Sequence, residues 1–253
     1  EVLVNENKQL LLLSSESNQQ AQSSSESLPD GFVFYGAPTG DIFERVQRSG
    51  KPLIAVDFET HDSASVNINN EDGAYTVANH GLISKPDSVA ILGLRLVDSN
   101  RICRLTAADI DLESKEISRS RLKGYVRALT DNQVVFSPSQ IWHIPLNTPD
   151  MAEIAAREAL TLSPLPKLVL CMSDVIALAV IRVAGELNID IPKDLQVTGF
   201  DDIPEAQRSV PGLTTVCQQS LEKGRVAAGL LFSHDAKQEI LLDTRLVVRQ
   251  SCA

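Results

Sequence analysis

The sequence predicts an α/β protein in which parallel sheets are covered by helices on both faces. Strand-like and helix-like segments alternate along the 253 residues, and this alternation calls for parallel strands joined by helical crossovers. The helix predicted for residues 174–187 carries one charge, Arg182, between Val175 and Gly185, and a helix without a polar face is buried on both sides. A chain of this length can form a large core, as one domain or as two lobes.

Local signals predict the elements in chain order. Strands are predicted for residues 9–13, 31–35, 52–56, 66–68, 88–92, 134–136, 141–144, 168–172, 195–200 and 246–248. Residues 2–7 are predicted to be the end of a helix. Further helices are predicted for residues 41–49, 73–83, 118–129, 149–160, 174–187 and 220–232. Gly50 ends one helix, Asp72 is suited to cap another, and either Ser173 or Asp174 caps the apolar helix. The last helix should bury Leu221, Val226, Leu230 and Leu231.

Two segments interrupt the alternation. Residues 14–27 are almost wholly Ser, Gln, Asn and Glu, which predicts a mobile surface segment or, in competition, a short and poorly anchored helix. Residues 93–116 are mixed, and their stretches LRLV and RICRL could form a small hairpin.

Composition argues against several classes of function. A net charge of −10 and a pI near 4.9 argue against binding of this chain to the phosphate backbone of a nucleic acid, because such binding needs a basic face. No apolar run approaches the length of a membrane span, so no membrane partner is expected. The four cysteines show no CxxC spacing, which fits a reducing cytoplasm better than a disulfide framework.

Enzyme motifs are missing from the sequence. It contains no GxSxG, Walker, HExxH or GxGxxG pattern, and no cofactor or metal is expected. The four histidines lack metal-ligand spacing and are expected at the surface or in loops; they are His61, His80, His143 and His234. Asp201 and Asp202 make a poor acid–base dyad, because adjacent residues of an extended backbone point in opposite directions.

Polar residues at strand ends and early helical turns form a candidate binding set. Ligands of open α/β sheets bind beyond the carboxyl ends of the strands, where Asp201 follows a predicted strand. The set comprises Asp57, Arg121, Ser173, Asp201 and Gln218. Carboxylates can accept hydrogen bonds from sugar hydroxyls, and an arginine can donate a planar fork to a hydroxyl, carboxylate or phosphate. Each position has a plainer alternative, such as a solvated turn, a surface salt bridge, a helix cap or a hinge.

Three ordered motifs carry a family resemblance. Ser173-Asp174 opening a helix, then VTGFDD, then PGLTTVCQ resemble the effector-binding core of LacI/GalR-type bacterial transcription regulators. The resemblance implies a two-lobed, periplasmic-binding-protein-like fold of type I, with three crossovers between lobes that each contain a parallel sheet flanked by helices. The implied lobes are residues 1–85 with 218–239, and residues 86–217 with 240–253.

The resemblance also implies roles for individual residues. Asp57, Arg121, Ser173, Asp201 and Gln218 match the effector-contacting positions of the family. Ile68 and Phe200 match positions that line or support the pocket, which the family places between the lobes. Trp142 precedes a loop in which an aromatic stacking platform could lie.

The function implied is ligand sensing and dimerisation in a transcription regulator. A small-molecule effector, a sugar or related polar metabolite, would modulate operator DNA binding through an N-terminal helix-turn-helix head that this sequence lacks. The main alternative is a periplasmic sugar-binding protein of a transport system, and a hydrolase or isomerase is a third possibility. A homodimer is expected through the apolar helix and the segment after GFDD, at Val175, Leu178, Val180, Ile203 and Ala206.

Overall fold

A computed structural model describes residues 2–6, 8–12, 29–37, 42–60, 62–110, 116–233 and 238–252. The chain separates into two compact units. Unit 1 contains Glu1–Ile68 and Gln219–Leu242, and unit 2 contains Asn69–Gln218 and Asp243–Ala253. The chain therefore passes between the units three times, as the family resemblance implied.

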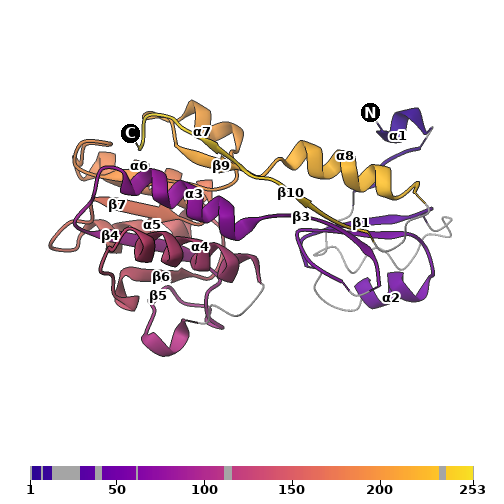
Figure 1. The fold of residues 1–253 in the computed structure, drawn as a ribbon, viewed down its shortest axis with the longest axis horizontal. Helices are drawn as coiled ribbons and strands as arrows, with labels where there is room; N and C mark the ends of the chain where they lie inside the picture. The colour runs from indigo at the N-terminus through magenta and orange to yellow at the C-terminus, as the bar shows by residue number, and fades with distance from the viewer. Residues whose placement is uncertain are drawn as a thin grey trace. The chain divides into compact units, whose positions relative to one another are not determined.

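Unit 1 is a parallel sheet with helices on both faces. Its strands are β1 (Phe32–Tyr35), β2 (Leu53–Val56), β3 (Ala64–Ile68) and β10 (Glu239–Leu242), in the order β1-β2-β3-β10. Its helices are α1 (Val2–Asn5), α2 (Ile42–Arg48) and α8 (Ser220–Leu230). Helix α8 packs on one face and α2 lies on the other (Figure 1).

Unit 2 is a larger sheet of the same kind. The strands β4 (Val89–Leu94), β5 (Cys103–Arg104), β6 (Ile141–Ile144), β7 (Leu168–Cys171) and β8 (Gln196–Thr198) are ordered β5-β6-β4-β7-β8. All neighbouring pairs are parallel except β5 with β6. The strands β9 (Thr215–Cys217) and β11 (Arg245–Val247) form a separate antiparallel pair.

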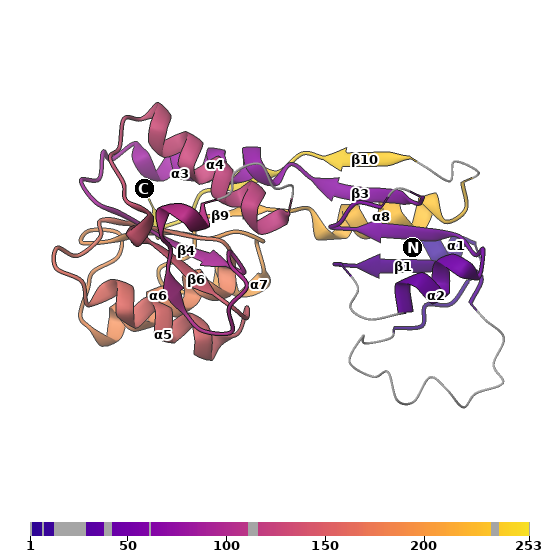
Figure 2. The same cartoon turned by 90° about the horizontal axis from the view of Figure 1, so that it is seen from below.

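Helices cover both faces of the unit 2 sheet (Figure 2). Helices α3 (Asn70–Leu82) and α4 (Ile117–Asp131) lie on one face, and α5 (Pro149–Leu160) and α6 (Asp174–Glu186) lie on the other. A short helix, α7 (Pro204–Arg208), follows the GFDD turn, and two 3-10 turns cover Ala107–Asp109 and Pro138–Gln140.

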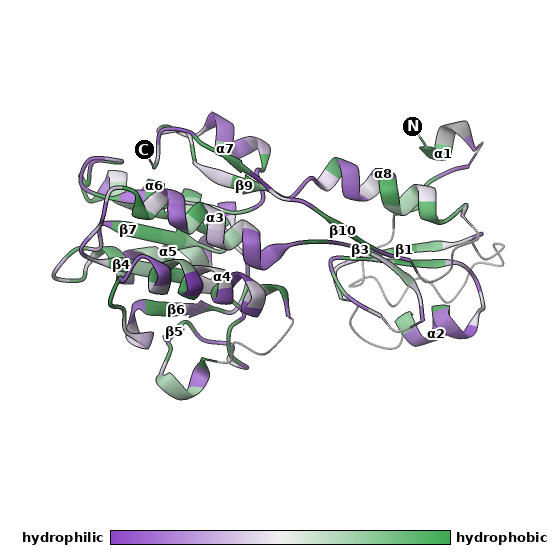
Figure 3. Cartoon of the chain, in the orientation of Figure 1, coloured by the Kyte–Doolittle hydropathy of each residue, from purple (hydrophilic) through white to green (hydrophobic). Residues whose placement is uncertain are grey.

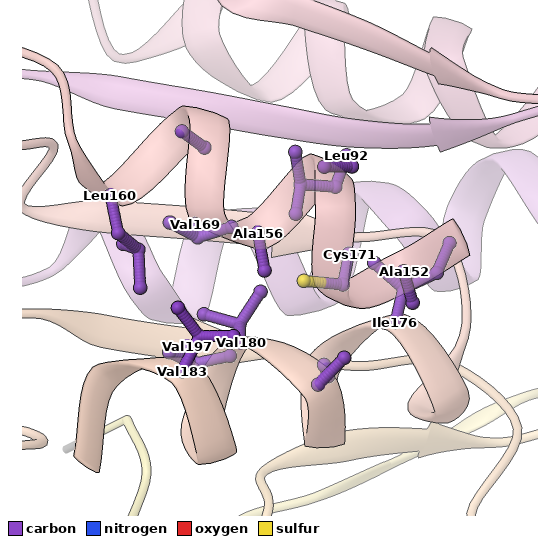
Figure 4. Packing of buried hydrophobic residues seen from close by; sticks show 14 of the residues in the cluster. Leu92, Ala152, Ala156, Leu160, Val169, Cys171, Ile176, Val180, Val183 and Val197 are labelled. Carbon is purple, nitrogen blue, oxygen red and sulfur yellow. The ribbon is translucent and has the colours of Figure 1, made fainter. Parts of the chain in front are cut away.

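The core of unit 2 is formed largely by small and branched side chains. Ala152, Ala156 and Leu160 of α5 meet Val180 and Val183 of α6 in the close view of the packing (Figure 4). Strand β7 is hydrophobic along its length (Figure 3), and all four of its residues are buried. Removing this apolar surface from water is the main force that stabilises the layers.

The division between the units differs from the boundary expected at Lys85. The chain leaves unit 1 after Ile68, so α3 belongs wholly to unit 2. The reason is that α3 packs against α4, and Gly124 allows a close approach. A Cβ atom at Gly124 would clash with the backbone oxygen of Glu71. The later crossings lie after Gln218 and after Leu242, where 218 and 240 were expected.

Several predicted elements are wrong in detail. Residues 134–136 form no strand, and the strand predicted at 9–13 is absent from 8–12, where Leu10, Leu11 and Leu12 are exposed. The RICRL stretch pairs with β6 rather than with LRLV. Asn69, rather than Asp72, caps α3, because its Oδ1 accepts the backbone N–H of Asp72. The segment 14–27 lies outside the described residues.

Helix α8 packs three of its four predicted residues, Val226, Leu230 and Leu231, against the core of unit 1, and Leu221 is the exception. Leu221 is 93% exposed, whereas Lys223 and Ala227 are buried against the sheet. Residues four apart share one face of a helix, so placing Lys223 and Ala227 inward turns Leu221 outward. Among the described helices, none is long and apolar enough to cross a membrane.

Candidate functional site

The carboxyl edge of the unit 2 sheet carries a cluster of polar side chains. Arg121 lies one turn into α4 and is 8% exposed. Its Nε donates to Asn70 Oδ1 at 2.9 Å, and its Nη1 donates to the backbone oxygen of Met172 at 2.6 Å. Nη1 also lies 3.4 Å from Asp201 Oδ1. The three partners come from the start of α3, the end of β7 and the turn after β8, so one guanidinium joins three elements.

Asp201 is the second centre of this cluster. Its Oδ1 accepts a hydrogen bond from Gln218 Nε2 at 3.1 Å, in addition to the contact with Arg121. Its backbone N–H donates to Val216, which holds the GFDD turn beside β9. Asp201 has φ 126°, a conformation that costs free energy in any residue other than glycine. The sequence predicted Arg121, Asp201 and Gln218 separately, and the structure brings all three together.

Ser173 lies at the end of the neighbouring strand β7. Its hydroxyl donates to Asn147 Oδ1 at 2.7 Å and accepts the backbone N–H of Ile176, so it also caps α6. Asn147 is exposed in the loop after β6. The binding alternative and the capping alternative for Ser173 are therefore compatible, because one hydroxyl can donate and accept.

Phe200 is buried beneath the polar cluster and packs against the side chain of Arg121. Its side chain is completely buried, and its ring lies 3.7 Å from the guanidinium carbon of Arg121. A cation over an aromatic face is attracted by the ring quadrupole. Ile68, the other predicted pocket residue, is buried at the end of β3 in unit 1.

Asp57 lies in unit 1, where its carboxylate is paired with a lysine. It follows β2 with φ 63°, and both carboxylate oxygens accept from Lys223 Nζ, at 2.8 and 2.7 Å. The Asp57 side chain is 11% exposed and that of Lys223 is completely buried. Asp57 is therefore one half of a buried ion pair rather than a solvated turn residue.

A second buried aspartate, Asp174, connects the start of α6 to β9 and to the GFDD turn through hydrogen bonds. Asp174, the first residue of α6, accepts the hydroxyl of Thr215 at 2.5 Å and the backbone N–H of Ile203 at 2.9 Å. Burial raises its pKa to about 7, the nearby charges of Asp201 and Asp202 act in the same direction, and the two hydrogen bonds oppose the rise. Gly199 permits this arrangement, because a Cβ there would clash with Asp174 Oδ1.

Two predictions about aromatic and histidine residues are wrong. Trp142 is buried in the core, where its Nε1 donates to Glu158, so it offers no stacking platform. His143 is buried rather than exposed: its Nδ1 accepts the backbone N–H groups of Leu96 and Val97, and Nε2 donates to the carbonyl of Ser99. His80 is half-buried, and His61 and His234 lie outside the described residues.

Sequence reasoning also missed three residues that contribute to these clusters: Asn70, Asn147 and Lys223. The positions of Asn70 and Asn147 carry a signal, because each follows a strand and stands at or just before a helix start. Lys223 gives none, since a lysine in an amphipathic helix is normally assigned to the solvent face. In the part of the chain that the structure describes, no three His, Cys, Asp or Glu side chains are grouped to hold a metal ion.

Of the two predicted interface segments, only part is available to a partner. Val180 and Ala206 are completely buried within unit 2, so their assignment to a subunit contact is corrected. Val180 packs against α5, which is why the sheet does not have to cover that side of α6. Val175, Leu178 and Ile203 are half-buried.

Comparisons with known proteins identify the family of the domain. A family model described as a periplasmic binding protein-like domain matches residues 100–252, more than half of the chain. The uncharacterised HTH-type transcriptional regulator YvdE of Bacillus subtilis (strain 168) is 29% identical over 88% of this chain and 65% of its own length. The HTH-type transcriptional repressor CytR of Escherichia coli (strain K12) is 33% identical over 55% of this chain and 42% of its own length.

A solved structure shows the same fold. The LacI family transcriptional regulator from Enterococcus faecium, crystallised with bound ribose, aligns with a TM-score of 0.71 and 24% identity, covering 88% of this chain and 79% of the other. The chain thus spans less than two thirds of the length of the two curated relatives. With the family model matching over the larger part of the chain, the chain belongs to the periplasmic binding protein-like domain family.

Proposed function

We propose that this chain is the effector-binding core of a LacI-type transcription regulator, and that a small polar metabolite is its effector. The observation that carries the proposal is the convergence of Arg121, Asp201, Asn70 and Gln218 at the carboxyl edge of the unit 2 sheet. Both curated relatives are named as transcription regulators, which favours this function over transport or turnover.

The chemistry of the cluster suits a hydroxyl-rich, uncharged ligand. Arg121 and Gln218 supply donors, and Asp201 supplies a charged acceptor. The arginine and the aspartate offset each other, so the cluster has little net charge to attract an ion. The structure with bound ribose supports a sugar as the effector class. We include Ser173 with Asn147 as further ligand contacts, and Asp57 as the contribution of unit 1.

Calorimetry with ribose and cellobiose tests this proposal. Arg121→Ala or Asp201→Ala should weaken binding about 10-fold to 100-fold, the range for hydrogen bonds to charged groups. Arg101→Ala provides the matched control, because Arg101 is exposed and distant in sequence from the cluster. Equal affinity in the wild type and both site variants would show that this edge does not bind the sugar.

We further propose that the chain forms a two-fold symmetric dimer through the outer face of α6. Leu178 and Ile181 are half-buried on that face beside the charged Arg182, and Ile203 is half-buried just before α7. An isologous contact would cover these apolar residues twice, once in each subunit. Leu178→Asp should therefore give a monomer in light scattering, whereas Arg182→Lys should remain dimeric. A monomeric wild type at micromolar concentration would contradict the proposed dimer.

A further inference from the structure

Lys223 is the most unusual charged residue of unit 1. It is a lysine in the first turns of α8 with no exposed side-chain surface. An ammonium group is strongly hydrated, and burying it is costly unless a counter-charge and hydrogen bonds replace the water. Asp57 supplies both, through two hydrogen bonds of 2.8 and 2.7 Å. The pair is therefore a specific arrangement rather than an incidental surface contact.

The pair lies at the carboxyl edge of the unit 1 sheet. Asp57 follows β2, and Tyr35 is the last residue of the neighbouring parallel strand β1. The Tyr35 ring centroid is 5.4 Å from Lys223 Nζ, and Tyr35 is 64% exposed. This edge of unit 1 therefore presents an aromatic ring beside a carboxylate whose charge is compensated from behind.

The backbone at Asp57 explains why the carboxylate needs a fixed partner. With φ 63° the residue is in the left-handed region, which aspartate tolerates better than most residues. In this conformation Asp57 turns its carboxylate toward α8, where Lys223 holds both oxygens. Without the ammonium group the carboxylate would be largely buried and unpaired, and it would have to move or attract a different cation.

We propose that Lys223 is a positioning and specificity-determining residue of the effector site, acting through Asp57. This inference rests on the proposed function, because it takes Asp57 as an effector contact. Lys223 fixes the direction of the acceptor lone pairs and cancels the charge of the carboxylate. Unit 1 therefore offers an electroneutral acceptor next to an aromatic ring, which suits an uncharged sugar and discriminates against a cationic one.

The test uses the full chain with four probes: ribose, cellobiose, glucose and its cationic counterpart glucosamine. Lys223→Met keeps the length of the side chain without its charge, Asp57→Asn keeps the shape of its partner, and the double variant removes both charges. Lys51→Met is the matched control, because Lys51 is an exposed lysine of the same unit. Calorimetry measures affinity, and urea unfolding measures stability without any probe.

We expect Lys223→Met to weaken binding of the neutral probe that binds the wild type about tenfold or more, and to raise the affinity ratio of glucosamine to glucose. In the Asp57→Asn background the same substitution should have almost no further effect on affinity, because the residue through which it acts has lost its charge. A cost that is equal in both backgrounds, or a wild-type affinity in Lys223→Met, would overturn the positioning role.

Unfolding without a probe decides the case in which none of the four binds. Either single substitution should lower the urea midpoint clearly, and the double variant should recover most of the loss, because breaking a buried pair costs more than replacing both partners. Additive losses would overturn the pairing of Lys223 with Asp57. Recovery in the double variant without binding of any probe would keep the pair but reject the proposed effector class.

Discussion

The buried Asp174 predicts that the stability of unit 2 falls as pH rises toward neutrality. Its pKa is raised by burial from 3.8 to about 7. Between these two values the folded protein binds more protons at this position than the unfolded protein does, so the free energy of unfolding decreases with increasing pH. Because one pH unit corresponds to about 1.4 kcal/mol, the contribution lost over the whole range is about 4 kcal/mol.

Asp174→Asn isolates this contribution. An asparagine can accept the N–H of Ile203 with its oxygen and donate to the hydroxyl of Thr215 with its nitrogen. Both hydrogen bonds are therefore kept without a titrating group. We expect the variant to gain on the order of 2–4 kcal/mol relative to the wild type when urea unfolding is compared at about pH 5 and about pH 8. The exposed Asp98→Asn serves as a control. If wild type and Asp174→Asn lose stability equally between the two pH values, the residue does not titrate as its burial requires.

Three further predictions concern other parts of the chain. Val180→Asp should unfold unit 2 whatever the oligomeric state, because it buries a carboxylate among apolar side chains; circular dichroism showing a folded monomer would contradict this. His143→Ala should cost on the order of 2–4 kcal/mol in urea unfolding, since it orphans the N–H groups of Leu96 and Val97. These 253 residues, with net charge −10, should not retain duplex DNA in a gel shift at physiological salt, and sequence-specific retention would refute that expectation.

The fold was largely predictable because periodicity and apolar runs act locally. The strands at Leu53–Val56 and Leu168–Cys171 and the helix at Pro149–Leu160 agree closely with their predicted ranges. The errors arose where contacts with a segment distant in sequence determine which secondary structure forms. The RICRL stretch extends because β6 offers an open edge, and a local reading cannot supply that neighbour.

The candidate site was predictable to the extent that topology places residues at strand ends. Asp201 follows β8 at the carboxyl edge of the parallel sheet, and Arg121 of α4 and Gln218 after β9 contact it there. Lys223 was not predictable, because its burial depends on a counter-charge 166 positions away in sequence. Val180 was misassigned for a related reason: an apolar helix needs two covers, and the second proved to be α5 of the same chain rather than a partner subunit.

The aspartates at the strand ends of both units share an unusual backbone conformation. Asp57, Asp201 and Asp202 all have positive φ, at 63°, 126° and 56°, and each follows a strand of a parallel sheet. Such conformations disfavour residues other than glycine, and they persist only where surrounding contacts hold them. The contacts here are ionic in every case: Lys223 holds Asp57, Arg121 contacts Asp201, and Arg249 donates to Asp202 at 2.7 Å. A glycine would adopt the same backbone at lower cost but would carry no carboxylate. The presence of an aspartate at each of these three turns, paired with its own cation, therefore favours a role for the charged oxygens in addition to the turn itself.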